Sequence, residues 1–217
     1  MKRLFSLFTI VCVSIFIFAC SNQEKSELKM ESDGGNDSES SKSNVEVRTY
    51  KEPLTKVGEK AAHPFGVFVL NQLSEPNMNI TLGPLYIQVD SIKIAQSKDV
   101  SDIGKYNLKE RGLNTEKMNI IQLTTTLENT SDQPLYLGKG PIKTLVLSNG
   151  EQVSVHKMNA DPKDLGLKAK EKTEFTLICF LSQDPIDLKY IKVITDVVRE
   201  QITQKEVSPS KTVEIKM

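Results

Sequence analysis

The sequence predicts an all-β protein whose main body is an antiparallel β-sandwich of about seven strands between residues 78 and 196. Apolar residues recur at every second position in several short segments, as at Leu85, Ile87 and Val89, which is the period of a half-buried strand. Turn-forming residues such as Asn149-Gly150 separate these segments. Because no segment has a helical pattern of comparable strength, short strands joined by turns are expected throughout this region.

The expected strands follow one another at short spacing. They are residues 79–82, 85–94, 121–127, 135–137, 142–147, 153–155, 175–181 and 188–193. In the second of them the apolar positions change phase across Asp90-Ser91, which predicts a β-bulge or a bend. Asn149-Gly150 predicts a two-residue hairpin turn of type I′, in which both residues have positive φ angles.

The segments around these strands are less regular. Residues 49–77, which proline and glycine interrupt, are expected to form an extended lead-in with one short strand, Phe65 to Leu70 being their only apolar run. Residues 95–117 are expected to form a long charged loop with at most a single helical turn. Residues 197–217 are expected to be a C-terminal extension.

The N-terminus carries the features of a bacterial export signal. Lys2 and Arg3 supply positive charge, and the uncharged stretch Leu4 to Ala19 follows them. This stretch is shorter than the ~20 residues of a membrane-spanning helix, so residues 1–19 are expected to be a signal peptide. The sequence Ile17-Phe18-Ala19-Cys20 resembles the lipobox of bacterial lipoproteins, with Phe18 where a small residue is usual. The resemblance implies that Cys20 carries a diacylglycerol anchor in the mature protein.

The segment that follows the anchor is expected to be a disordered tether, residues 20–48. It is rich in serine and charged residues and has almost no aliphatic side chains, so it cannot bury enough apolar surface to fold. A flexible coil of this length spans roughly 30 Å. The expected location of the protein is therefore the extracytoplasmic face of the bacterial cell membrane.

Three segments resemble an immunoglobulin-like domain of uncharacterised function that occurs in lipoproteins of Gram-positive bacteria. They are Leu82-Gly83-Pro84-Leu85-Tyr86-Ile87-Gln88-Val89, residues 123–135, and Leu167-Lys168-Ala169-Lys170-Glu171-Lys172-Thr173. The resemblance covers roughly half the chain, Met78 to Thr195, and implies an immunoglobulin-like sandwich whose fold is similar to that of a secreted mycobacterial immunogenic protein. Because these motifs encode strands and turns, they imply a fold and a location but no activity.

The composition argues against several classes of function. Lys and Arg number 28, and so do Asp and Glu, so there is no surplus of positive charge to attract nucleic acid. Three cysteines and two histidines are too few for a disulfide framework or a structural zinc site. The chain has no Gly-x-Ser-x-Gly elbow, P-loop or dinucleotide-binding motif. We therefore expect no catalytic activity, no cofactor and no nucleic-acid partner.

Four residues are candidates for chemistry or recognition. His156 and Met158 would share one face of a strand, an arrangement suited to Cu(I), although a solvated histidine beside a packing methionine is the favoured interpretation. Cys179 alternates with apolar residues of its strand and is expected to be buried and unreactive. Tyr106, in the loop 95–117, is the candidate anchor for a partner protein.

Two functional hypotheses remain open at this point. The first is a non-enzymatic, lipid-anchored surface protein that binds a protein or a cell-wall component through loops of the sandwich. The second is an extracytoplasmic copper chaperone or envelope enzyme that uses His156, Met158 or Cys179. The two hypotheses differ in whether these three side chains converge in the folded protein.

Overall fold

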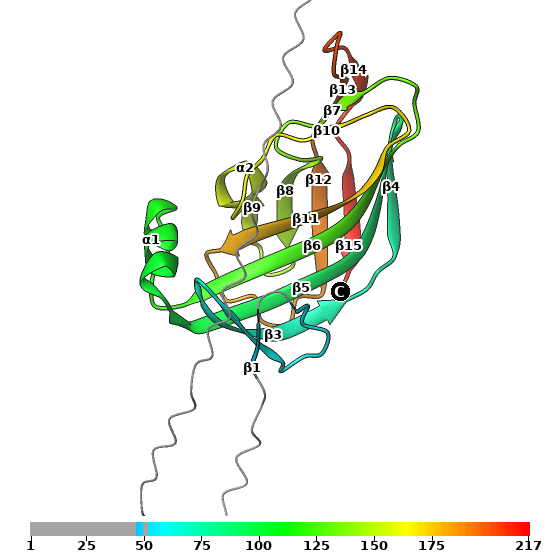
Figure 1. Cartoon of the computed structure of the whole chain (residues 1–217). Coiled ribbons are helices and arrows are strands. Elements are labelled where there is room, and N and C mark those ends of the chain that lie inside the picture. Colours follow the sequence, from blue (N-terminus) through cyan, green and yellow to red (C-terminus); the bar gives the residue numbers. More distant parts are fainter. Residues whose placement is uncertain (1–46, 50–51) are drawn as a thin grey trace, which may run out of the picture. The chain divides into compact units, whose positions relative to one another are not determined.

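Fifteen strands and two short helices make up the described part of the chain, residues 47–49 and 52–217 of the computed structural model (Figure 1). The strands form three sheets in which nearly all neighbours run antiparallel; β1 and β2 are the parallel pair among the described strands. The predicted all-β sandwich is confirmed. The predicted signal peptide, Cys20 and most of the predicted tether lie outside the described residues.

The larger layer is a seven-stranded sheet built on two long strands. Its strand order is β1 (Val47–Thr49), β2 (Lys60–His63), β3 (Gly66–Ser74), β5 (Leu85–Val100), β6 (Met118–Asn129) and β11 (Lys172–Leu181), with β4 (Met78–Leu82) paired to β5. β5 pairs with β3 through one part of its length and with β4 through another. This sheet therefore continues beyond the predicted sandwich strands on the N-terminal side.

The predicted irregularity at Asp90-Ser91 is present in β5. The pairing of β5 with β6 shifts register between Val89 and Ser91. Because side chains alternate between the faces of a strand, the extra residue lets Val89 and Ile92 both face the core, where each is fully buried. The phase change in the sequence is thus the signature of a β-bulge.

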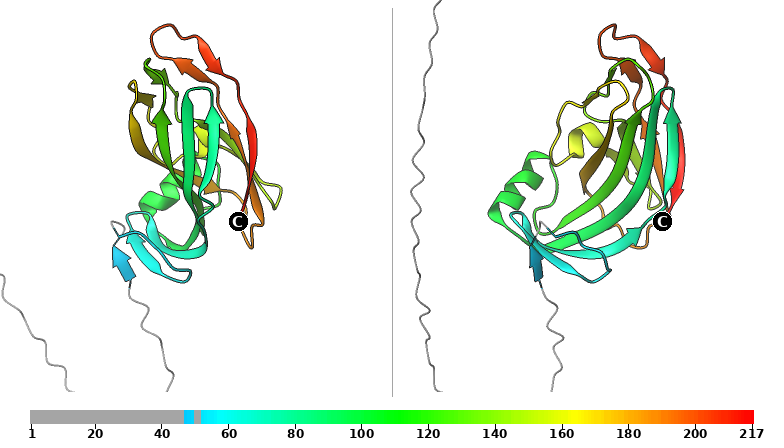
Figure 2. Two further views of the ribbon diagram at one scale, coloured as in Figure 1. Left: turned by 90° about the vertical axis from the view of Figure 1, so that its right-hand side faces the viewer. Right: turned by 45° about the vertical axis from the view of Figure 1, so that its right-hand side comes forward.

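The second layer packs against the large sheet and encloses the main core (Figure 2). Its strands are β15 (Thr212–Lys216), β12 (Tyr190–Thr195), β8 (Ile142–Leu147) and β9 (Gln152–Ser154), in that order. Leu123 of the large sheet and Leu145 and Ile191 of the second are fully buried in this core. Burial of each such side chain contributes about 1.5–3 kcal/mol to stability.

A small third sheet completes the sandwich and includes part of the C-terminal segment. Its strands are β10 (Gly166–Leu167), β7 (Leu135–Tyr136), β13 (Val198–Glu200) and β14 (Glu206–Ser208). β13 and β14 come from the predicted C-terminal extension, as does β15 of the second layer. Ile215 of β15 is almost fully buried in the core, so this segment is integral to the sandwich.

The Asn149-Gly150 segment joins β8 to β9 as an antiparallel hairpin, as predicted. Gly150 has a φ of 90°, whereas Asn149 is not among the residues with positive φ. The prediction of a type I′ turn is therefore wrong, although the hairpin is confirmed. The backbone N–H of Leu147 donates to the carbonyl of Glu151 across the turn, at 2.9 Å.

The expectation of a long loop over residues 95–117 is wrong. β5 continues to Val100, and the helix α1 (Asp102–Glu110) follows it. The hydroxyl of Ser101 caps this helix by accepting a hydrogen bond from the backbone N–H of Gly104 at 3.1 Å. Leu108 anchors it in a second apolar cluster with Phe68 and Phe180. Long-range packing thus orders a segment whose own sequence is mostly polar.

Candidate functional site

The residues that carry the copper hypothesis do not meet at a common site. His156 and Met158 lie in the single-turn helix α2 (Val155–Met158), where residues two apart do not share a face. The His156 side chain is 44% exposed, and its Nε2 lies 3.6 Å from a carboxylate oxygen of Asp196. Met158 packs instead on the main core. The pair therefore does not share one face of a strand, and the positions agree with the favoured interpretation of a solvated histidine beside a packing methionine.

Cys179 is buried in the main core, as its place in the strand pattern predicts. Burial raises the pKa of its thiol to about 12, because the apolar surroundings disfavour the thiolate. At neutral pH the nucleophilic form of this cysteine is therefore hardly populated. Within residues 47–49 and 52–217 there is also no cluster of three or more His, Cys, Asp or Glu side chains that could hold a metal ion.

Tyr106 is exposed on α1, where Ile103 is also exposed. The two residues are three positions apart in the helix, so they share a face and form a small apolar patch. Cys20, the predicted lipidation site, lies outside the described residues. In the described part of the chain no helix is long and apolar enough to cross a membrane.

Sequence reasoning did not identify an apolar pocket of about 410 Å³ on the outer face of the large sheet. Its floor is formed by side chains that alternate with core residues: Ala95 on β5, Ile120 on β6, and Ile178 and Phe180 on β11. The hairpin of β2 and β3 forms one side of the pocket, through Ala61, His63, Phe68 and Leu70. The rest of the described lining consists of the segment 52–54, Phe65, Lys93, Gln122 and Ala160.

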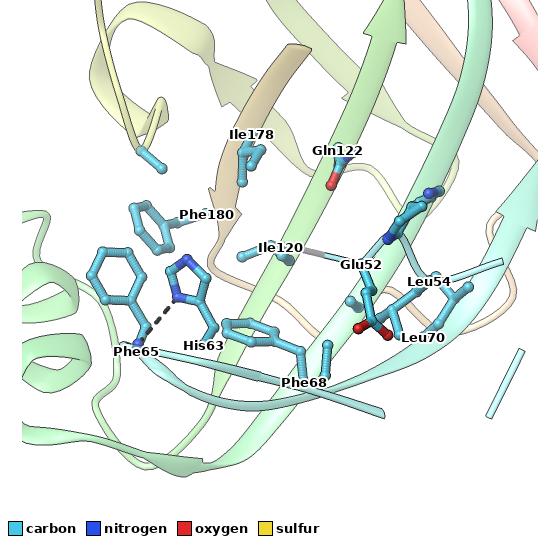
Figure 3. A pocket seen from close by; sticks show the side chains of 15 residues that line it. Glu52, Leu54, His63, Phe65, Phe68, Leu70, Ile120, Gln122, Ile178 and Phe180 are labelled. Carbon is cyan, nitrogen blue, oxygen red and sulfur yellow. Dashed lines mark hydrogen bonds between the residues drawn. The ribbon is translucent and has the colours of Figure 1, made fainter. Parts of the chain in front are cut away.

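Aromatic side chains gather at one end of this pocket, whereas Gln122, Glu52 and Leu54 lie towards the other (Figure 3). The ring centres of Phe65 and Phe180 are 6.4 Å apart. Aromatic and aliphatic walls with few polar groups are typical of sites that bind small apolar ligands, and such sites have volumes of about 300–1,000 Å³. The pocket therefore has the size and the lining of a ligand-binding site.

His63 is part of the aromatic end of the pocket. Its Nδ1 accepts a hydrogen bond from the backbone N–H of Phe65 at 3.1 Å, and its ring contacts those of Phe65 and Phe68 edge to face. Burial lowers the pKa of this imidazole, because the charged form is disfavoured away from water. The neutral form of His63 is therefore favoured at this place in the pocket.

Arg111, just after α1, stabilises the aromatic wall from behind. Its guanidinium carbon lies 4.7 Å from the centre of the Phe180 ring, a cation–π contact. It also donates hydrogen bonds to the carbonyls of Asn107, at 3.0 Å, and Asn159, at 3.1 Å. These contacts connect α1 to the chain after α2 and fix the position of Phe180 in the pocket wall.

A second hollow, of about 690 Å³, lies between β3, β5 and residues 184–187 and is more polar. Asp184, one of two aspartates in its lining, accepts hydrogen bonds from Lys117 and from Asn119, the latter at 3.0 Å. The hydrogen bond from Lys117 is the largest cause that lowers the pKa of the Asp184 carboxyl, and the hydrogen bond from Asn119 is the second. Because this carboxylate already has partners, the hollow is a weaker candidate for ligand binding than the apolar pocket.

The sequence did contain a signal for the pocket. At Ile120-Ile121 and from Ile178 to Leu181 the alternation of apolar and polar residues stops, and consecutive positions are apolar. Such runs indicate strands that are covered on both faces. The core covers one face of β6 and β11, and the other face forms the floor of the pocket.

No protein-family model and no curated protein matches the chain. Among solved structures, a functionally unknown protein from Listeria monocytogenes is similar, with a TM-score of 0.51 and 14% identity, over 70% of this chain and 87% of its own. A candidate lipoprotein from Bacillus subtilis is similar with a TM-score of 0.42 and 11% identity, over 66% of this chain and 39% of its own. At such low identity, the similarity to the Listeria protein shows a common fold and nothing about function.

Proposed function

We propose that this protein is a non-enzymatic, lipid-anchored binding protein of the bacterial cell surface, and that its pocket takes an apolar group of an envelope component. The single observation that carries the binding function is the pocket itself, with three phenylalanines and several aliphatic side chains around about 410 Å³. The predicted export signal, with Cys20 at its end, supports the proposed location.

The chemistry of the lining favours binding over catalysis. Among its described residues the pocket has no serine, threonine or cysteine that could act as a nucleophile. Its histidine is held among aromatic rings with Nδ1 occupied by a backbone N–H. The alternative, a copper chaperone or envelope enzyme, loses support because His156 faces Asp196 while Cys179 is buried in the core.

The proposal is tested by titrating the mature chain without its acyl group, residues 21–217, with the neutral fluorophore N-phenyl-1-naphthylamine. This probe becomes bright in apolar surroundings, so we expect a saturable increase in fluorescence. Ala160→Phe should weaken binding at least ten-fold, since it places a ring in the pocket from a surface segment outside the sheets.

The matched control is Ala62→Phe, the same substitution at an exposed residue of β2 that is not part of the lining. This variant should bind the probe like the wild type. Equal binding by the wild type and the Ala160→Phe variant, or no saturable binding at all, would refute the assignment of this pocket as the binding site.

A further inference from the structure

Lys93 gives the pocket a positive charge on its rigid floor. Its neighbours Ile92 and Ile94 are fully buried in the main core, so Lys93 lies on the opposite face of β5, where it lines the pocket. Its side chain is half-buried, and it has no ion pair or hydrogen bond with the residues that the structure describes. A lysine that lines a mostly apolar pocket and has no partner there is a natural contact for a ligand group of opposite charge.

The position of Lys93 places this charge at the polar end of the pocket. Lys93 is directly opposite Gln122 in the ladder between β5 and β6. In Figure 3, Gln122 is well separated from Phe65, Phe180 and His63, which form the aromatic end. The pocket is therefore amphipathic, with an apolar end and an end that offers an ammonium and an amide.

Glu52 is the one carboxylate among the described lining residues, and it does not cancel this arrangement. It is exposed and belongs to the segment before β2, whereas Lys93 is half-buried in the sheet. The charge of an exposed carboxylate is screened by water and salt, which weakens its interaction with Lys93. The net preference at the floor of the pocket is therefore for a negative group.

Part of the pocket is formed by the first described residues of the chain. β1 begins at Val47, within the last two residues of the predicted tether 20–48, and pairs with β2, which supplies Ala61 and His63 to the lining. The segment 52–54 lines the pocket as well. Along the chain, these are the pocket residues nearest to the predicted membrane anchor.

We infer that the pocket binds a single-chain amphiphile with an anionic head, its tail against Phe65, Phe68 and Phe180 and its head at Lys93 and Gln122. Free fatty acids and single-chain anionic phospholipids share this chemistry. The inference rests on the proposed function, because it assumes that the pocket binds an apolar group and adds which class of molecule carries that group.

The test is a competition against N-phenyl-1-naphthylamine on the chain 21–217, with three competitors of identical tail used below their micelle concentrations. These are dodecanoate, dodecanol and dodecyltrimethylammonium. We expect dodecanoate to displace the probe at the lowest concentration. Lys93→Gln should weaken the binding of dodecanoate about ten-fold, the factor that corresponds to one lost charge-assisted hydrogen bond. The binding of dodecanol should be unchanged.

Two further variants separate the charge of Lys93 from its contribution to folding. Lys98→Gln changes an exposed lysine of the same strand and should keep the preference for dodecanoate. Lys93→Arg retains the positive charge and should therefore also retain the preference for dodecanoate. The preference measured in the wild-type protein remains a test even if Lys93→Gln does not fold.

The outcomes distinguish the two proposals. The inference of an anionic head group is refuted if all three competitors displace the probe equally, or if Lys93→Gln weakens the binding of dodecanol as much as that of dodecanoate. In either case the proposal that the pocket binds an apolar group still holds. If none of them displaces the probe, the proposed function itself fails. When dodecanoate is preferred, competition with lysophosphatidylglycerol and lysophosphatidylcholine identifies the source of the ligand. Stronger displacement by lysophosphatidylglycerol than by lysophosphatidylcholine supports a membrane lipid. Displacement by dodecanoate but by neither lysophospholipid supports a free fatty acid.

Discussion

Replacement of Phe180 by alanine is expected to destabilise the domain by about 3–5 kcal/mol, the usual cost of truncating a buried aromatic side chain. Phe180 is 1% exposed, and it packs with Leu108 and Met118 in the second apolar cluster. Its removal leaves a cavity and also takes away the surface on which Arg111 rests. The loss of stability is measured by urea denaturation.

The control for this variant is Tyr106→Ala, which removes an aromatic ring that is 64% exposed on α1. That substitution should change stability by less than about 0.5 kcal/mol. A loss below about 1 kcal/mol in Phe180→Ala would mean that this cluster does not fix α1 and the pocket wall in the way described.

Replacement of Cys20 by alanine is expected to abolish lipid labelling of the protein in its bacterial host. The protein should then be released from the membrane or accumulate as uncleaved precursor. The physical reason is that two acyl chains, at about 0.8 kcal/mol for each buried CH₂ group, supply the membrane affinity that the predicted anchor requires. The measurement is metabolic labelling with a fatty-acid analogue, followed by membrane fractionation.

Cys12→Ala provides a matched control, because Cys12 lies within the apolar part of the predicted signal peptide. This variant should be labelled and anchored like the wild type. Labelling that persists in Cys20→Ala, or that is lost in Cys12→Ala, would show that the lipobox has been assigned to the wrong residue.

The strands were predictable because local patterns determine them. The alternation at Leu85, Ile87 and Val89 and its change of phase at Asp90-Ser91 are both found in β5, the second as a bulge. Burial of one face of a strand imposes such a pattern on the sequence directly. The hairpin at Asn149-Gly150 was visible for the same reason, because the turn needs a residue that tolerates positive φ.

The helices were not predictable from local patterns. In α1 the apolar residues Ile103 and Tyr106 are exposed, and Leu108 is its one large buried side chain. Gly104 allows a close approach, since a Cβ at that position would lie 2.5 Å from the carbonyl oxygen of Phe65. The helix thus depends on residues that are distant in sequence. For His156 and Met158, the assumption of an extended backbone failed because α2 interrupts the strand pattern.

The pocket required knowledge of strand pairing. The apolar pairs at Ile120-Ile121 and Phe180-Leu181 indicate two covered faces, but the sequence does not state what covers the second one. The cover is the β2–β3 hairpin together with residues 52–54, all from the segment interpreted as a lead-in. Lys93, between two core isoleucines, gives no signal in the sequence, because a charged residue at alternate positions is normal for a solvated strand face.

The central claim, that an apolar ligand occupies the outer-face pocket, is tested most directly by methyl NMR of the chain 21–217 during titration with dodecanoate. Neighbouring residues on β6 and β11 face opposite sides of the sheet, so they serve as internal controls. We predict saturable shifts of the methyl signals of Ile120, Ile178 and Leu54, which line the pocket, while those of Ile121 and Leu177 in the core stay nearly constant. Shifts confined to the core methyls, or no saturable shifts at Ile120 and Ile178, would contradict the account.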